Sequence, residues 1–540
     1  MMTFHRRLVV SASVLALSIS ACGGGGGGDK NDPGDGNDPQ SLVRVSARSP
    51  FTAGCGGPSG GGTVFLNAEV EPFLAVNPSS PANLIAVWQQ DRWSNGGALG
   101  IMTGVSFDEG QTWTLQALPF SRCAGGTTAD GGNFDRATDP WVTFSPDGVA
   151  YELGQTFTGA VRQAGSSSAM RVSRSLDGGL AWSTPVTLIL DGDAAFNDKG
   201  SITADPFDSR FVYAVWDRID SADHGPTYFT RTTDAGESWE APRSIYDAGP
   251  SDQTLNNQIV VLPDGTLIDC FTRFHTATDA SSASTMTAII GIVRSPDRGA
   301  SWSSLLKVDD ALSVGVDDPE TGARIRSAAF IASIAVAPDG GLWVAWQDGR
   351  FSGFARDAIA ITHSIDGGLN WSEPVQVNGD PSVPAFLPTV SVAIDGTIAV
   401  SYYDLRANTS DPNTLPTEYR LARSTDGIVW TDTSIAGPFD LRMAPNASGL
   451  FLGDYQALRA IGTSFMPLFV QTTGAGSANR TDVFTVPMPL SSGASAAEGF
   501  VHAAKAALPV SRTPESARKV SENVVRTLKQ RLPGRAAALP

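Results

Sequence analysis

Ser106-Phe107-Asp108-Glu109-Gly110-Gln111-Thr112-Trp113 is a stretch of the form S-x-D-x-G-x-T-W that returns along the chain. The last copy has one residue fewer between Asp and Trp. Successive copies are 57 to 69 residues apart. A repeat of this length indicates similar structural units packed side by side. The aspartates of the six copies are Asp108, Asp177, Asp234, Asp297, Asp366 and Asp426.

The residue types of this repeat favour a tight turn between two strands. The Asp carboxylate accepts hydrogen bonds from backbone N–H groups of the turn, and Gly adopts a positive φ there. The Trp provides a large apolar plate that packs against neighbouring structure. The repeat therefore predicts a hairpin that is held by its own hydrogen bonds.

Apolar strand patterns alternate with these turns. Examples are Leu84–Trp88, Val212–Trp216, Leu342–Trp346 and Ile398–Tyr402. With 57 Gly, 34 Pro and only 17% charged residues, the composition favours many short strands and excludes a coiled coil. The 41% of hydrophobic residues exclude disorder throughout. Six units of about 64 residues fit the chain, so we predict an all-β, six-bladed β-propeller over residues 46–490.

The repeat resembles the Asp-box, or BNR repeat, of the sialidase (neuraminidase) superfamily over roughly residues 64–490. In that family the box joins the outer strands of each propeller blade, on the rim away from the active-site mouth. The same box occurs in propellers that hydrolyse nothing, so the resemblance is specific for the fold. It implies a glycan partner and, for the catalytic members, arginines that bind a sugar carboxylate, a Tyr–Glu nucleophile and an Asp acid/base.

Four arginines follow equivalent strands, each one or two residues after an aspartate. If they form a ring at the channel mouth, their planar guanidinium groups would bind the carboxylate of an anionic sugar. The alternative is a set of salt bridges within and between blades. The candidate substrate-binding residues are Arg92, Arg218, Arg350 and Arg406.

Three further residues are candidates for catalysis. Tyr455 is the candidate nucleophile, Asp139 the candidate acid/base and Glu71 a carboxylate partner, because a glycosidase needs two acids, or an acid and a Tyr, around one bond. Glu71 lies where the family has an Arg-Ile-Pro motif. We expect an exo-glycosidase of the exo-α-sialidase type. The alternative is a non-catalytic propeller that binds a glycan or protein at the cell envelope.

The N-terminus has the features of an export signal. Two basic residues, Arg6 and Arg7, precede an apolar run that is too short to span a bilayer. The sequence before Cys22 resembles a bacterial lipobox; the alternative is an ordinary signal peptide. We expect a lipoprotein signal at 1–22, with Cys22 lipidated, and a flexible Gly/Asp/Asn/Pro linker at 23–45. These features predict a protein held by its lipid in the bacterial cell envelope, at the outer membrane or the cell surface.

The remaining cysteines suit an oxidising compartment. Cys55 and Cys123 lie in Gly-rich loops and are expected to form a disulfide, whereas Cys270 lies in an apolar strand and is expected to be free. With five His and no metal-ligand spacing, we expect neither a metal nor another cofactor. The net charge of −17 disfavours nucleic-acid binding.

The segment 491–540 is rich in Ala, Lys and Arg and is expected to be partly helical. Pro514 lies at a good helix start. The residues spaced as one apolar stripe are Val520, Val524, Val525, Leu528 and Leu532. This tail either docks on an anionic envelope surface or a partner, or it packs on the propeller or is disordered.

Overall fold

The computed structural model describes residues 42–58, 60–250, 252–278, 284–474, 480–487, 499–507 and 513–531. The expected signal peptide, its Cys22 and the linker as far as residue 41 lie outside the described residues. The described chain is all-β, with a single α-helix near its C-terminal end. No described helix is long and apolar enough to cross a membrane.

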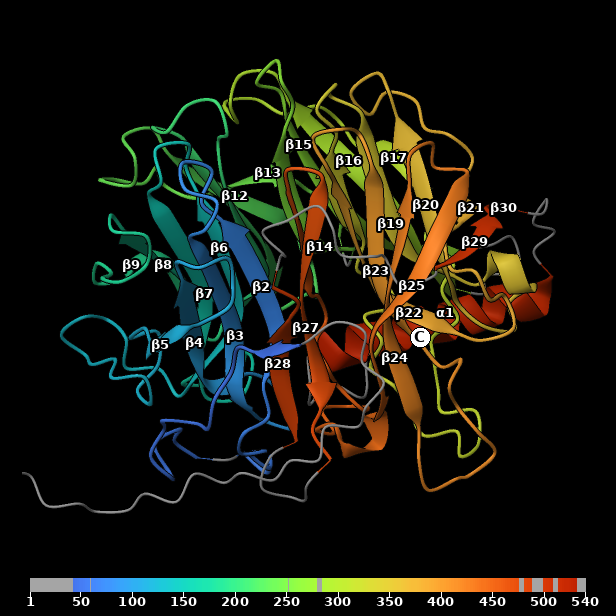
Figure 1. The fold of residues 1–540 in the computed structure, drawn as a ribbon. Coiled ribbons are helices and arrows are strands. Elements are labelled where there is room, and N and C mark those ends of the chain that lie inside the picture. The colour runs from blue at the N-terminus through green and yellow to red at the C-terminus, as the bar shows by residue number, and fades with distance from the viewer. Residues whose placement is uncertain are drawn as a thin grey trace, which may run out of the picture. The chain divides into compact units, whose positions relative to one another are not determined.

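The strands of the described chain fall into seven antiparallel groups (Figure 1). The first group contains β2 (Val70–Val76), β3 (Leu84–Arg92), β4 (Ala98–Ser106) and β5 (Thr114–Ala117). The second contains β6 (Arg136–Phe144), β7 (Ala150–Thr158), β8 (Ser167–Ser175) and β9 (Val186–Asp191). The third contains β10 (Ala195–Ala204), β11 (Val212–Asp220), β12 (Thr227–Thr232) and β13 (Arg243–Tyr246). The single pair Ala98–Ala137 joins the first two groups into one sheet.

The remaining groups repeat this order. The fourth contains β14 (Gln253–Val261), β15 (Leu267–Thr278), β16 (Ser284–Ser295) and β17 (Leu306–Asp310). The fifth contains β18 (Ser333–Val336), β19 (Leu342–Asp348), β20 (Ala358–Ser364) and β21 (Val375–Gln376). The sixth contains β22 (Ala385–Val392), β23 (Ile398–Asp404), β24 (Pro416–Ser424) and β25 (Val429–Asp440). The seventh contains β26 (Ala457–Ile461), β27 (Ser464–Thr472), β28 (Thr481–Thr485) and the N-terminal β1 (Val43–Arg44).

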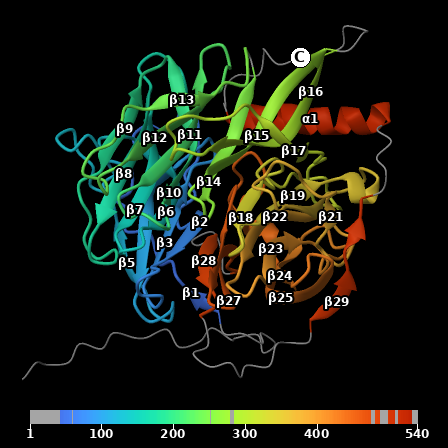
Figure 2. The same cartoon turned by 90° about the horizontal axis from the view of Figure 1, so that it is seen from above.

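The seven groups close into a ring. The first strand of each group contacts the first strand of the next, and β26 contacts β2. In Figure 2 the first strands of the groups lie around the middle of the ring, where their side chains line a channel. This arrangement is a β-propeller, as predicted. We predicted six blades because the sequence has six Asp turns. Strands β26–β28 form a further group that has no Asp turn, so the predicted number was too low.

The predicted turns have the expected hydrogen bonds. In the second group, Asp177 Oδ1 accepts a bond of 2.9 Å from the backbone N–H of Ala181 and another of 2.9 Å from Ser175 Oγ. Gly179 has a φ of 103°, and Trp182 Nε1 donates to the Gly179 carbonyl at 2.8 Å. Each of these turns joins the third and fourth strands of its group, so it fixes the outer hairpin.

Shorter elements complete the fold. Cys55 and Cys123 form a disulfide, and Cys270 is buried and free, as predicted. The chain also contains the 3₁₀ turns η1 (Arg350–Ser352) and η2 (Leu441–Met443), the edge strands β29 (Phe500–Ala503) and β30 (Lys505–Ala506), and the helix α1 (Pro514–Arg531). Strands β29 and β30 pair with β25 and β21 and so cover two sheet edges.

Burial of Glu152 in β7 makes the stability of the propeller depend on pH. Its carboxyl accepts a hydrogen bond from Thr103 Oγ1 at 2.8 Å, and burial raises its pKa to about 8. The folded state therefore holds this proton up to a higher pH than the unfolded state, whose carboxyl loses it near pH 4.5. This contribution to stability is complete below that pH and is lost as the pH rises towards 8.

We expect Glu152→Gln to reduce the loss of stability between pH 5 and 8 by about 1.4 kcal/mol per pH unit, the slope that one proton contributes. Urea unfolding at a series of pH values measures this slope. The exposed Glu373 provides the control, because Glu373→Gln should leave the slope unchanged. An identical slope in the parent and in Glu152→Gln would contradict the prediction.

Candidate functional site

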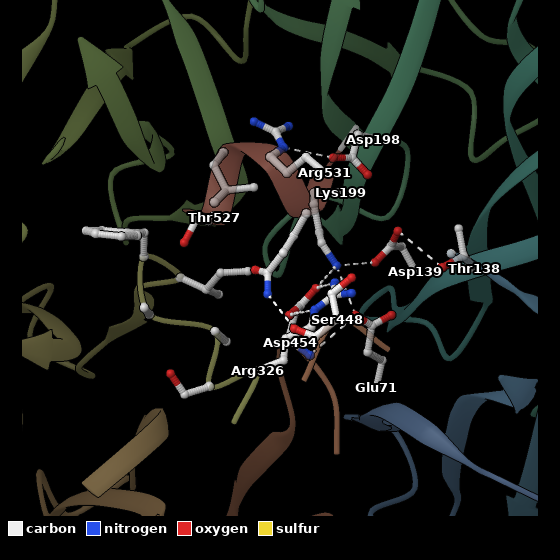
Figure 3. A pocket seen from close by; sticks show the side chains of 18 of the residues that line it. Glu71, Thr138, Asp139, Asp198, Lys199, Arg326, Ser448, Asp454, Thr527 and Arg531 are labelled. Carbon is white, nitrogen blue, oxygen red and sulfur yellow. Dashed lines mark hydrogen bonds and ion pairs between the residues drawn. The ribbon is translucent and has the colours of Figure 1, made fainter. Parts of the chain in front are cut away.

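Three charged side chains meet at one end of the channel because their strands are bulged. The first strands of the first three groups have register irregularities at Glu71, Asp139 and Lys199. These residues have φ values of 54°, 48° and 49°. Positive φ is uncommon for residues other than Gly and is found at functional sites, and a β-bulge redirects a side chain. The bulges bring these three side chains together (Figure 3).

A fourth charged residue, Asp454, completes this group, which we call the Lys199 cluster. Lys199 Nζ lies 2.9 Å from Glu71 Oε1, 2.7 Å from Asp139 Oδ1 and 2.8 Å from Asp454 Oδ2. Each of the four side chains is at most 8% exposed. Arg326 also pairs with Asp454, its Nε lying 3.1 Å from Oδ1. Lys199 is thus bound by three buried carboxyl groups at once.

Close backbone contact fixes Asp454 against Glu71. Gly453 has a φ of 144°, and a Cβ at this position would lie 2.8 Å from the backbone nitrogen of Glu71. Only Gly fits such a contact without displacing backbone. The Asp454 N–H donates to Glu71 Oε1 at 3.3 Å. The sequence Gly453-Asp454 therefore joins the seventh group to the first at this site.

The pKa values of two carboxyl groups in the cluster are shifted in opposite directions. Burial and the neighbouring Asp139 raise the pKa of Glu71 to about 8, although Lys199 opposes the shift. Burial also acts to raise the pKa of Asp454, but Arg326 and Lys199 overcome it and hold that pKa well below its usual range. Although burial opposes it, the carboxylates around Lys199 raise the pKa of its ammonium well above the usual range. At neutral pH, Glu71 is therefore a proton donor beside an ionised Asp454.

A cavity of about 90 Å³ opens on the cluster. Its wall includes Gln155, whose side chain is fully buried and whose amide atoms have no hydrogen-bond partner within the described chain. The Nε atoms of Arg92 and Arg324 are also unpartnered there. Buried polar groups in proteins are nearly always hydrogen-bonded, so these unpartnered atoms distinguish the wall of the cavity, although each atom is itself buried. Aromatic wall residues are Phe157, Phe196 and Phe330.

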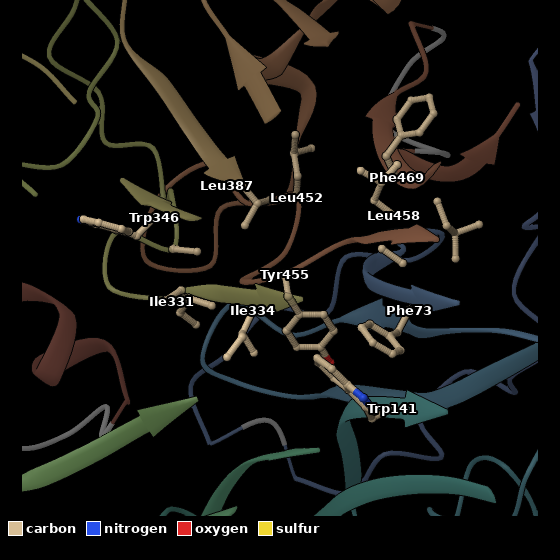
Figure 4. Close-up of a cluster of buried hydrophobic side chains, with 14 of the residues drawn as sticks. Phe73, Trp141, Ile331, Ile334, Trp346, Leu387, Leu452, Tyr455, Leu458 and Phe469 are labelled. Atoms are coloured by element: carbon tan, nitrogen blue, oxygen red, sulfur yellow. The ribbon is translucent and has the colours of Figure 1, made fainter. Parts of the chain in front are cut away.

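Two of the three predicted catalytic residues, Glu71 and Asp139, lie in this cluster, whereas Tyr455 lies behind it. The Tyr455 hydroxyl donates to the Pro140 carbonyl at 3.1 Å. Its ring packs edge-on against Trp141, with centroids 5.3 Å apart, in the apolar lining of the channel (Figure 4). Burial and the acids of the cluster raise the pKa of Tyr455 well above the usual range. The side chain lines the channel, about 460 Å³ in volume, and not the cavity at its end.

The four predicted arginines do not form one ring around the cavity. Arg92 lines it, and its guanidinium lies 4.9 Å from the Phe451 ring centroid. The other three form ion pairs with acids of the same group or of the preceding group, which is the salt-bridge alternative. These pairs are Arg218–Asp191 at 2.7 Å, Arg350–Asp348 at 2.9 Å and Arg406–Asp432 at 2.9 Å.

Sequence reasoning missed Lys199, Arg326 and Gln155. Lys199 had a detectable signal, because Glu71 and Asp139 are each followed by Pro in the first strand of their groups and Lys199 holds the matching place before a Gly. Arg326 lies in a loop and Gln155 in a second strand, and no repeated pattern marks either of them.

Comparisons with known proteins find only distant similarity to solved structures. No protein-family model and no curated protein matches the sequence. Among solved structures, a Hadza microbial sialidase is 19% identical, with a TM-score of 0.41; the match covers 62% of this chain and 63% of the sialidase. The GH93 α-L-arabinofuranosidase of Fusarium graminearum, solved with arabinobiose, is 12% identical, with 67% of this chain and 92% of that chain covered and a TM-score of 0.42. The Trypanosoma rangeli sialidase, solved with sialic acid, is 13% identical, with 78% and 58% covered and a TM-score of 0.39. The chain thus spans less than two thirds of either sialidase.

Proposed function

We propose that the protein binds a glycan in this cavity and hydrolyses a terminal glycosidic bond, as an exo-glycosidase. The observation that carries the proposal is that the carboxyl groups of Glu71, Asp139 and Asp454 meet on the wall of one buried cavity. Within this group the pKa of Glu71 is raised and that of Asp454 is lowered. Titratable groups with opposed shifts of this kind mark the acid and the anionic partner of glycosidases.

In the proposed reaction, the carboxyl proton of Glu71 passes to the glycosidic oxygen as the bond from that oxygen to the anomeric carbon breaks. Asp454 remains ionised and stabilises the positive charge that develops on the sugar. A water molecule adds to the anomeric carbon, and its proton passes to Asp139. Lys199 positions all three carboxyl groups. Tyr455 can act as the nucleophile only if its hydroxyl leaves the Pro140 carbonyl.

The wall of the cavity has the features of a carbohydrate site. The Gln155 amide offers one acceptor and one donor group, which match a sugar hydroxyl. The Nε groups of Arg92 and Arg324 are further donors, and the aromatic wall residues offer apolar contact for a sugar ring.

A panel of fluorogenic terminal glycosides, including sialosides and arabinofuranosides, tests the proposal. Turnover of at least one member is expected. The absence of both turnover and saturable binding for every glycan would overturn it.

On the substrate that is turned over, we expect Gln155→Leu to raise KM about tenfold while kcat changes less than about twofold, because a ground-state hydrogen bond is lost. The exposed Gln163 is the matched control, and Gln163→Leu should leave both constants unchanged. Unchanged KM in Gln155→Leu would remove Gln155 from the binding site.

A second candidate function is non-catalytic binding of a glycan or protein. The observation that favours it is that Lys199 forms ion pairs with all three carboxyl groups. Charges that neutralise one another in this way can have a purely structural role. Saturable glycan binding without turnover, unchanged by Glu71→Gln, would support this function. In either case, a lipid anchor at Cys22 would hold the protein at the bacterial cell envelope.

A further inference from the structure

Helix α1 lies across the cavity that contains the Lys199 cluster. Five of its residues contribute to the cavity wall together with Glu71 and Asp454, namely Asn523, Arg526, Thr527, Gln530 and Arg531. Figure 3 shows Thr527 and Arg531 beside the cluster. A segment that follows the propeller strands in the sequence thus forms one wall of the candidate site.

The helix is seated by a narrow apolar stripe and by polar contacts on either side of it. Of the predicted stripe, Val520, Val524 and Leu528 are buried. Val525 is half-buried, and Leu532 lies outside the described residues. Asn523 Nδ2 donates to the Ser313 carbonyl at 3.2 Å. Gln530 Nε2 donates to the Ser448 carbonyl at 3.1 Å. The last turn of α1 is thereby directed into the cavity.

Arg531 attaches the last turn of α1 to the propeller. Its Nε donates to Asp198 Oδ2 at 3.0 Å, and its guanidinium also reaches Asp217 Oδ2 at 2.9 Å and the Thr254 carbonyl at 2.8 Å. The Arg531 side chain is only 5% exposed. Asp198 belongs to β10 and Asp217 to β11, so one guanidinium joins α1 to two propeller strands.

The helix also restricts the space at the site. With α1 in place, the cavity holds about 90 Å³, whereas sites for small molecules hold roughly 300–1,000 Å³. The backbone hydrogen bonds of α1 lie within the helix, so lifting it breaks side-chain contacts and no strand pairing. Removing it would enlarge the cavity and leave the propeller ring intact.

We propose that α1 is a displaceable cover, which closes the cavity when Asp198 and Asp217 hold Arg531 and opens it when they release Arg531. The cover acts on the access of any molecule to the Lys199 cluster. It therefore extends the proposed function without depending on which sugar is bound, or on whether the site is catalytic.

Thiol labelling inside the cavity measures opening. Ala329 lines the cavity and is 8% exposed, so Ala329→Cys in the full chain reports access. Its reaction with iodoacetamide is followed by mass spectrometry of the peptide that contains it. We expect Arg531→Met to raise the labelling rate about tenfold or more, because a broken buried ion pair weakens the closed state. Arg531→Lys should give an intermediate rate.

Arg518→Met is the matched control, because Arg518 lies on the same helix but its side chain is 61% exposed. It should label at the parent rate. Leu528→Ala weakens the apolar seat independently and should raise the rate in a chain that keeps Arg531. Circular dichroism establishes that each variant is folded. Equal labelling rates in the parent, Arg531→Met and Leu528→Ala would overturn the proposal. Because no sugar is used, this result is separate from failure of the glycosidase assay.

Discussion

Replacing Lys199 with Met should lower the free energy of unfolding by about 3–5 kcal/mol, the cost of breaking a buried ion pair by removing one partner. The ammonium of Lys199 lies within 2.9 Å of Glu71, Asp139 and Asp454. Met fills a similar volume without a charge. The acids then face one another in a buried site, with Arg326 pairing only with Asp454.

Urea unfolding measures this loss. The control is Lys307→Met, because Lys307 pairs with Asp310 at 2.8 Å but its side chain is 51% exposed, and surface pairs contribute only about 0–1 kcal/mol. The double variant Lys199→Met with Asp139→Asn should regain part of the stability, since it removes an acid that has lost its ion-pair partner. A loss below about 1 kcal/mol in Lys199→Met would show that the cluster contributes little to stability.

Glu71→Gln should reduce kcat about 10²–10⁴-fold, the usual contribution of a general acid, with KM little changed. Gln keeps the shape of Glu71 but has no acidic proton to transfer. Glu69→Gln is the matched control, because Glu69 is equally buried two residues earlier and bonds to Gln90, but it does not line the cavity. Equal losses in the two variants would indicate a general effect of buried acids and not catalysis by Glu71.

The pH profile separates proton donation from a structural role. A general acid acts only while it is protonated, so kcat/KM should be sustained below about pH 8 and fall above it, following the raised pKa of Glu71. In Glu71→Gln this alkaline fall should disappear. An alkaline limb that persists in the variant would assign the titration to another group.

Much of the fold could be predicted from the sequence because the Asp turns are local. Asp177 and Gly179 lie within one hairpin, so their spacing alone defines the turn. The seventh group was missed because its third strand, β28, and its fourth, β1, come from distant parts of the chain, so no Asp turn joins them. Pairing of Val43 with Thr485 could not be inferred, since it joins the two ends of the propeller chain.

The site could be predicted only in part. Glu71 and Asp139 were predicted as the acids that a glycosidase needs, and both lie in the cluster. Lys199 was not predicted because its partners come from other groups and meet it only when the ring closes. Arg326 could not be predicted because its partner, Asp454, is 128 residues away in the sequence. The predicted ring of arginines was wrong because a nearby acid binds the guanidinium group. Arg350, for example, pairs with Asp348 two residues earlier and therefore does not extend towards the channel.

The pairing of β1 with β28 also determines when the molecule can be completed. Residues 43–44 supply the fourth strand of the seventh group and their partner strand ends at Thr485, so this group is complete only when both strands are present. Exposed strand edges invite association with other chains. Separation of β1 from β28 would therefore expose an edge of β28 to pairing with other chains.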